Sequence, residues 1–142
     1  MKKIAVLTAG GDTPALNATL HGIVTRANQL QIDVLGIMNG FQGLFQPSAP
    51  HVHLNPQFSP IPELDPARGG SIIGSSRHYV HAGETEVLER VRKSIERLEI
   101  DGIVCIGGDG TLNGLQALCE LAPSVLAPKT IDNDLGLNMA DE

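Results

Sequence analysis

Four short runs of glycine, aspartate and small polar residues have the composition needed to hold phosphate groups. They are Thr8-Ala9-Gly10-Gly11-Asp12, the segment from Gly69 to Arg77, Gly107-Gly108-Asp109-Gly110-Thr111, and Pro128-Lys129-Thr130-Ile131-Asp132-Asn133-Asp134. Glycine lets the backbone approach a phosphate closely, and a helix that starts just afterwards offers free N–H donors and the positive end of its dipole. The runs therefore indicate a phosphate-binding site.

Asp109 gives the third run a more specific chemistry. A carboxylate beside a phosphate needs a cation between them, and Mg²⁺ bridging Asp109 to phosphate oxygens supplies one. This run predicts Mg-nucleotide binding with Asp109 as the metal ligand. Taken alone, a Gly-Gly-Asp turn also fits a plain left-handed turn followed by a helix cap, and neither such turn has the Walker A spacing.

Two further side chains are candidates for phosphoryl transfer. Asp132 could take the proton from an attacking hydroxyl, as the base of a phosphoryl-transfer enzyme does. The alternative is that Asp132, Asn133 and Asp134 form an ordinary turn held by local hydrogen bonds. Arg77 carries a fork of donors suited to bidentate phosphate contact, although an ordinary surface arginine is favoured when Arg77 is judged in isolation.

Hydrophobic spacing predicts the elements that position these runs. Short apolar stretches predict strands at 4–8, 34–38, 103–106 and 125–127, and apolar residues at helical spacing predict helices at 14–30, 84–99 and 112–121. The proline-rich stretch 39–76 is predicted as a long irregular loop. This order implies an α/β fold, a mostly parallel Rossmann-like sheet with helices on both faces, and the runs fall at the carboxyl ends of strands.

Three residues are candidate helix caps. Asp12 or Thr13 could cap the first helix, whose first position would be Pro14. Thr111 could cap the helix that follows the third run. Caps at these places would fix where each helix N-terminus meets its glycine turn.

Composition limits the class of protein. The 142 residues fit one domain, and 42% hydrophobic with 18% charged residues indicates a globular chain. The net charge of -6 argues against a nucleic-acid partner. No apolar run approaches the length of a membrane span, and the N-terminal apolar run is too short for a signal peptide. Cys105 and Cys119 form no CxxC pair and are predicted as buried thiols in a cytoplasmic protein.

Histidines provide no convincing metal site. His51 and His53 could share one face of an extended segment, but no third ligand lies nearby in the sequence. His21, His78 and His81 are also expected to be polar surface or core residues when judged by pattern alone.

Taken together, the four runs resemble the motifs of the phosphofructokinase family. Residues 10–18 (GGDTPALNA) resemble the family's opening motif, and the other three runs resemble the next three motifs, in order and at appropriate separations. Gly-Gly-Asp-Gly-Thr alone would also fit NAD kinases and diacylglycerol kinases, and residues 130–134 separate them. The resemblance covers essentially all of residues 1–142 and implies the N-terminal nucleotide-binding half, without the C-terminal substrate half.

The resemblance implies roles for individual residues. Donor-phosphate contacts are expected from Gly11, Arg77, His78, Gly108, Asp109, Gly110 and Thr111, with Asp109 on Mg²⁺, and the catalytic set is Lys129, Thr130 and Asp132. Asp132 would deprotonate the 1-hydroxyl of fructose 6-phosphate, giving fructose 1,6-bisphosphate, a step of glycolysis. The implied donor is ATP, and the full-length protein is expected to be a homo-oligomer.

Two positions point to different donors. Pyrophosphate-dependent members typically have Asp where Gly110 stands and Lys where Lys129 stands, whereas ATP-dependent bacterial members typically have Gly at both. Gly110 leaves room for an α-phosphate, so ATP is favoured and pyrophosphate is the alternative. A non-catalytic nucleotide-binding module is the other alternative, and the chain by itself is expected to lack a complete active site.

The same resemblance bears on regulation. Allosteric bacterial members carry two arginines on the first helix, where this chain has His21 and Thr25. Arg26 is one residue away, about 100° around the helix. Control by ADP or phosphoenolpyruvate at this site is therefore predicted to be weak or absent.

Overall fold

A computed structural model describes residues 1–132, so Asn133 and Asp134 of the fourth run lie outside the described residues. The elements follow in the order β1 (Lys3–Ala9), α1 (Pro14–Gln29), β2 (Asp33–Ile37), α2 (Phe41–Phe45), β3 (His51–His53), the 3₁₀ turn η1 (Pro56–Phe58), β4 (Ser75–Ser76), α3 (Thr85–Leu98), β5 (Gly102–Gly107), α4 (Asp109–Cys119) and β6 (Ser124–Pro128). The strands and helices predicted from hydrophobic spacing are all present.

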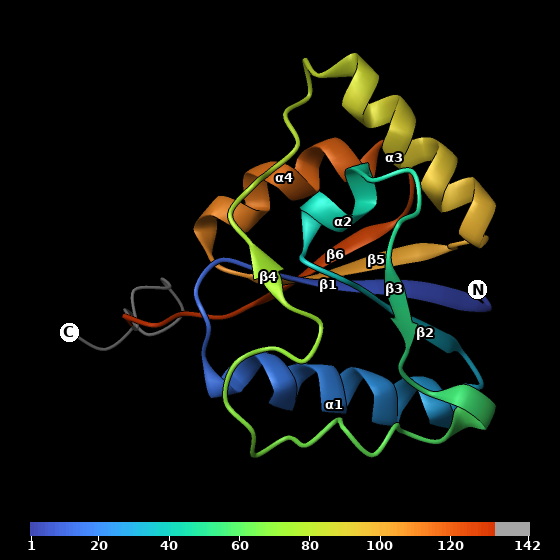
Figure 1. Ribbon diagram of the computed structural model, residues 1–142, viewed down its shortest axis with the longest axis vertical. Coiled ribbons are helices and arrows are strands. Elements are labelled where there is room, and N and C mark those ends of the chain that lie inside the picture. The colour runs from blue at the N-terminus through green and yellow to red at the C-terminus, as the bar shows by residue number, and fades with distance from the viewer. Residues whose placement is uncertain (133–142) are drawn as a thin grey trace, which may run out of the picture.

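These strands form one mostly parallel sheet, which confirms the predicted fold class (Figure 1). Its order is β3-β2-β1-β5-β6, with β4 pairing with β1. Only β3 runs antiparallel, beside β2. Val6 of β1 pairs with Gly36 of β2 on one side and Val104 of β5 on the other. The chain reverses its direction of travel across the sheet between β1 and β5, the kind of switch point where open α/β sheets bind ligands.

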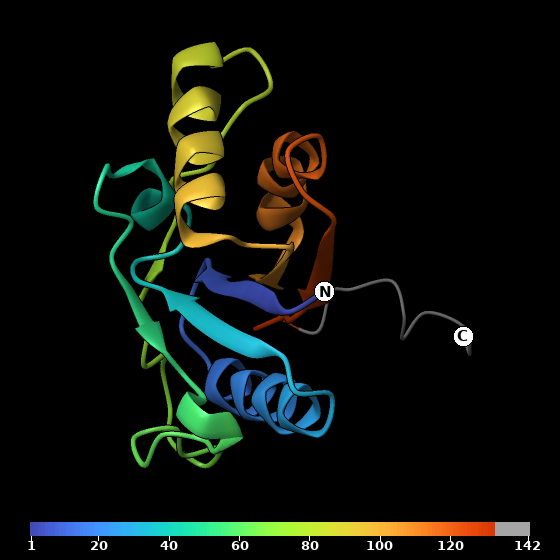
Figure 2. The same ribbon diagram turned by 90° about the vertical axis from the view of Figure 1, so that its right-hand side faces the viewer.

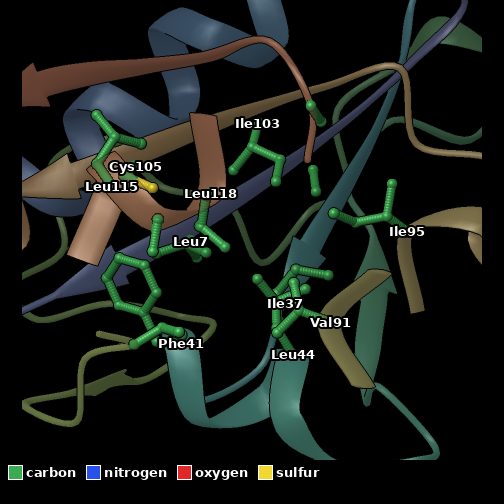
Figure 3. Packing of buried hydrophobic residues seen from close by; sticks show 14 of the residues in the cluster. Leu7, Ile37, Phe41, Leu44, Val91, Ile95, Ile103, Cys105, Leu115 and Leu118 are labelled. Atoms are coloured by element: carbon green, nitrogen blue, oxygen red, sulfur yellow. The ribbon is translucent and has the colours of Figure 1, made fainter. Parts of the chain in front are cut away.

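Helices cover both faces of the sheet (Figure 2). On one face, Leu16, Leu20 and Val24 of α1 pack in a cluster that includes Val6 and Ile106 of the sheet. On the other face, α2, α3 and α4 enclose a second cluster. Figure 3 shows its members Leu7, Ile37, Phe41, Leu44, Val91, Ile95, Ile103, Cys105, Leu115 and Leu118. The crossover β1-α1-β2 moves across the sheet in the opposite direction to β5-α4-β6, and right-handed connections then place α1 and α4 on opposite faces.

The prediction of an irregular loop over 39–76 is wrong in part. This stretch contains α2, β3, η1 and the two residues of β4. None of these is long enough to produce a detectable hydrophobic period. Ser75 and Ser76 become a strand only because they pair with Thr8 and Ala9 of β1. Tertiary pairing, rather than local preference, creates this element.

The cap predictions also need correction. The N-cap of α4 is Gly108, and Thr111 lies inside the first turn, with its side chain fully buried. A Cβ on Gly107 would overlap the Thr111 side chain, so a glycine is needed there. Thr13 does precede Pro14 at the start of α1, but its side chain makes no capping hydrogen bond.

The two cysteines differ in exposure. Cys105 is buried in β5, as predicted, whereas Cys119 at the end of α4 is exposed, which corrects the prediction of a buried thiol. Burial raises the pKa of the Cys105 thiol to about 12, because charge is costly away from water. Within residues 1–132, no helix is long and apolar enough to cross a membrane.

Candidate functional site

The turn after β1 is joined to the short strand β4, which lies in the second run. Gly10 has a φ of +81°, a conformation that glycine adopts without strain. Its N–H donates to the Ser76 carbonyl at 3.2 Å, and the Ser75 hydroxyl donates to the Gly10 carbonyl at 2.5 Å. The Thr8 hydroxyl donates to the Gly74 carbonyl at 2.8 Å. These bonds join the Gly10-Gly11 turn to the segment that leads into Arg77.

Asn17 fixes the beginning of that same segment, and the sequence analysis did not single it out. Its amide nitrogen lies 2.9 Å from the Arg68 carbonyl and 3.3 Å from the Gly69 carbonyl, and its amide oxygen accepts from the Ile72 N–H at 2.9 Å. The side chain is fully buried on the core side of α1. An asparagine on the apolar face of a predicted helix was the available signal, because buried polar groups need partners.

Lys129 connects the run after β6 with the turns after β1 and β5. Its ammonium group donates to the Gly11 carbonyl at 2.5 Å, and its backbone N–H donates to the Gly107 carbonyl at 3.0 Å. Only 8% of this lysine is exposed. A Cβ on Gly11 would come within 2.7 Å of Ile131 Cδ1, so the chain after β6 passes directly against the first turn. Three runs that are remote in sequence therefore meet at one edge of the sheet.

The N-terminus of α4 faces the same edge. Gly108 occupies the cap, and Asp109 is the first residue of the helix. Both Asp109 and Gly110 are exposed. The first turn of a helix presents N–H groups with no helical partner and a partial positive charge. This arrangement suits an anion, while the Asp109 carboxylate can hold a divalent cation beside it.

Three buried hydroxyl groups in this region lack a hydrogen-bond partner within residues 1–132. They are Thr13 Oγ1 beside the first turn, Ser76 Oγ at the end of β4 and Thr111 Oγ1 in the first turn of α4. Leaving such a group unpaired costs about 1–3 kcal/mol. Each belongs to a different candidate segment. Each lies in or next to one of the glycine-containing runs, where a ligand could complete its hydrogen bonding.

Several predicted site side chains point into solvent rather than into a closed cavity. Arg77, His78, Asp109 and Asp132 are all exposed. No ion pair joins them in the part of the chain that the structure describes. That part also contains no group of three or more side chains able to enclose a metal. The donor set fits Mg²⁺, which is usually held by one or two carboxylates together with the phosphates of its nucleotide.

The histidines of β3 serve the sheet edge instead. His51 and His53 share a face, as expected for alternate residues of a strand. His53 Nε2 lies 3.1 Å from the Asp33 carboxylate, and His51 Nδ1 lies 2.7 Å from the Ala49 carbonyl. Each ring therefore has one hydrogen-bond partner among the described residues.

The comparisons with known proteins agree on one family. A sequence model described as Phosphofructokinase matches residues 3–139. The ATP-dependent 6-phosphofructokinase of Vibrio cholerae serotype O1 is 37% identical over 136 residues, which cover 95% of this chain and 41% of that protein. The enzyme of the same name from Oceanobacillus iheyensis is 39% identical over 139 residues, with the same two shares. The chain therefore spans 41% of the length of these relatives.

Solved structures show the same fold. Phosphofructokinase from Saccharomyces cerevisiae matches with a TM-score of 0.74 at 22% identity, over 96% of this chain and 21% of that one. The pyrophosphate-dependent phosphofructokinase from Nitrosospira multiformis matches with a TM-score of 0.78 at 18% identity, over 96% of this chain and 35% of that one. At such identities, the similarity concerns the fold.

Proposed function

Because the chain belongs to the phosphofructokinase family, we propose that it forms the donor-binding half of an ATP-dependent 6-phosphofructokinase. The reaction is transfer of a phosphoryl group from MgATP to the 1-hydroxyl of fructose 6-phosphate. The observation that carries the proposal is the meeting of the turns after β1, β5 and β6, linked by Lys129. The unpaired hydroxyls around these turns support it.

On the donor side, backbone groups do most of the binding. The turns at Gly11, Gly108 and Gly110 let main-chain N–H groups approach the phosphates, and the N-terminus of α4 contributes its dipole. Arg77 adds a bidentate cation, and His78 lies beside it. Asp109 would hold Mg²⁺, and the ion would supply positive charge to neutralise the transferring phosphoryl group. Thr111 contributes its buried, unpaired hydroxyl.

On the acceptor side, the residues after β6 orient the sugar hydroxyl. Asp132 is exposed and free to approach a substrate, and it accepts the proton of the 1-hydroxyl. Thr130 lies between Asp132 and the buried Lys129. The ammonium group of Lys129 holds the Gly11 carbonyl and thereby keeps the acceptor and donor segments together. Asn133 and Asp134 lie outside the described residues.

Support for ATP rather than pyrophosphate comes from two sources. Relatives at 37% and 39% identity are named ATP-dependent enzymes. Gly110 is exposed and adds no side chain beside Asp109. The pyrophosphate-dependent structure matches at 18% identity, so it bears on the fold alone. Lys129 is compatible with either donor in its present contacts.

The test is a coupled assay on the full-length protein, with MgATP and then Mg-pyrophosphate as donor. Asp132→Asn should abolish most turnover while MgATP binding persists, and Asp109→Asn should weaken Mg-dependent binding of ATP. Glu120→Gln, at the opposite end of α4 from Asp109, serves as the control and should behave as wild type. Binding of MgATP with no sugar phosphorylation would instead identify a nucleotide-binding module. Turnover with pyrophosphate alone would reverse the donor assignment.

The accompanying proposals concern the cellular form of the protein. We infer a cytoplasmic homo-oligomer, and analytical ultracentrifugation with cell fractionation tests this. A monomer at working concentration would contradict the oligomer.

A further inference from the structure

Tyr79, the only tyrosine of the chain, packs on the first two turns of α4. A Cβ on Gly110 would lie 3.1 Å from its hydroxyl oxygen and 3.3 Å from its Cζ atom. A Cβ on Gly114, one turn later, would lie 3.1 Å from its Cδ1 atom. The ring therefore lies along a face of α4 that has glycine at both contact positions, with its hydroxyl at the Asp109 end.

A second aromatic ring supports Tyr79 from the core. The rings of Tyr79 and Phe41 meet edge to face, with centroids 5.6 Å apart and planes at 67°. Phe41 is fully buried, and a Cβ on Gly114 would lie 3.0 Å from its Cζ atom. Edge-to-face pairs are favourable beyond the area that they bury. Tyr79 thus has a defined seat, made by α2 and α4 together.

This seat connects two parts of the donor site. Arg77 directly follows β4, which is paired with β1, and Val80, just after Tyr79, is fully buried. The short segment around Arg77 is therefore held at one end by the sheet and at the other by Tyr79 on α4. Asp109 and Gly110 begin that same helix. A shift of the ring would move Arg77 relative to Asp109.

We propose that Tyr79 is a positioning residue of the donor site, which sets Arg77 against the N-terminus of α4 and leaves little room for a side chain at position 110. The proposal rests on the proposed function for the identity of the ligand. It also gives Gly110 a packing role in addition to its effect on the space for the donor. A side chain there, including an aspartate, would press on the Tyr79 ring, which would have to shift by a few tenths of an ångström.

The test is a double-mutant cycle between positions 79 and 110, measured as the Kd for MgATP by calorimetry on the full-length protein. Tyr79→Ala should weaken binding up to about tenfold, in line with the loss of one aromatic packing interaction. Gly110→Ala should also weaken it, because the new methyl group pushes the ring by a few tenths of an ångström. The double variant should be no weaker than Tyr79→Ala alone. Tyr79→Phe, which keeps the ring, should restore most of the affinity.

Steady-state kinetics separates positioning from a general loss of folded protein. Tyr79→Ala should raise the KM for ATP more than it lowers kcat, and Tyr79→Phe should reverse the change. Additive effects at positions 79 and 110, or wild-type affinity in Tyr79→Ala, would refute the proposal.

The 142-residue chain has one tyrosine, so 3-fluorotyrosine labelling of this chain gives a single ¹⁹F resonance that reports on the ring directly. Gly110→Ala should shift this resonance without any ligand, and MgATP should shift it in the wild type. An unchanged resonance in Gly110→Ala overturns the inference even if ATP binds. If neither MgATP nor Mg-pyrophosphate binds the wild type, the proposed function fails instead, and the ligand-free shift still reports whether a side chain at position 110 moves the Tyr79 ring.

Discussion

Replacing Asn17 with leucine should destabilise the protein severely, although leucine suits the apolar face of a helix better than asparagine does. Asn17 makes three hydrogen bonds to backbone groups, at the carbonyls of Arg68 and Gly69 and the N–H of Ile72. Leucine would leave all three without their present partner. At about 1 kcal/mol or more for each orphaned group, the loss is about 3 kcal/mol.

The assay is thermal and urea unfolding followed by circular dichroism. A loss of about 3 kcal/mol corresponds to a fall in Tm of about 10 °C for a domain of this size. Gln116→Leu is the matched control, because Gln116 is an exposed amide side chain on α4. Its effect should stay within about 0.5 kcal/mol. A loss below about 1 kcal/mol in Asn17→Leu, or one equal to the control, would refute a stabilising role for the three Asn17 hydrogen bonds.

Asn17→Asp sharpens this prediction through its pH dependence. An aspartate keeps an oxygen for the Ile72 N–H but places a carboxylate against the Arg68 and Gly69 carbonyls. The carbonyl oxygens favour the protonated acid, so the pKa of the new side chain should rise in the folded state. Stability is then greatest below the unfolded-state pKa and declines as the pH rises through the folded-state pKa. This variant should therefore lose more stability relative to wild type at neutral than at acid pH. Equal losses at both would count against the hydrogen bonds from the Asn17 amide nitrogen to the two carbonyls.

Four further outcomes follow from single residues. Thr111→Val should stabilise the ligand-free fold by about 1 kcal/mol, because it removes a buried unpaired hydroxyl, and it should weaken MgATP binding. Urea unfolding measures the first effect and calorimetry the second. A variant less stable than wild type would contradict the prediction. Cys119 should react quickly with a thiol reagent, while Cys105 should react only on unfolding. The pKa of Cys105 is raised from 9.0 to about 12 in the folded protein. The free energy of unfolding should therefore fall as the pH rises above about 9, where the thiol of the unfolded chain ionises first. Hydrogen bonds from the backbone N–H groups of Lys2 and Lys3 lower the pKa of Asp101. Its stabilising contribution is therefore present at neutral pH and lost on acidification through that lowered pKa. Asp101→Asn should make stability depend less on pH in the acid range, and an unchanged pH dependence would contradict this. ADP and phosphoenolpyruvate should have little effect on activity. The Thr25 hydroxyl donates to the His21 carbonyl at 2.8 Å, and neither position 21 nor position 25 carries an arginine. Activation at submillimolar concentration would overturn this.

The central strands β1, β2 and β5 could be predicted because they are largely buried on both sides. Their residues form short, nearly continuous apolar runs, and runs of this kind are visible without tertiary information. The glycine turns after these strands could also be predicted, because a tight backbone turn at a strand end favours glycine locally. Lys129, Asp109 and the other motif residues were therefore identified by position before their neighbours were known.

Other features depended on partners that are distant in sequence. Ser75 and Ser76 form a strand only beside β1, and Asn17 acts on a segment more than fifty residues later. Thr111 looked like a cap, but its side chain turns under Gly107 because α4 starts two residues earlier. Each case depends on a contact whose existence the local sequence does not encode.

The glycine turn at 107–111 is where both kinds of information apply. The sequence by itself determined that backbone here must bend tightly and that Asp109 precedes a helix, because glycine and aspartate impose those properties locally. Only the tertiary structure decided which neighbours use them. Lys129 holds the turn to Gly11, and Tyr79 packs beside Gly110. The physical reason is that backbone conformation follows from adjacent residues, whereas packing and hydrogen bonding across a sheet follow from how separate segments are brought together.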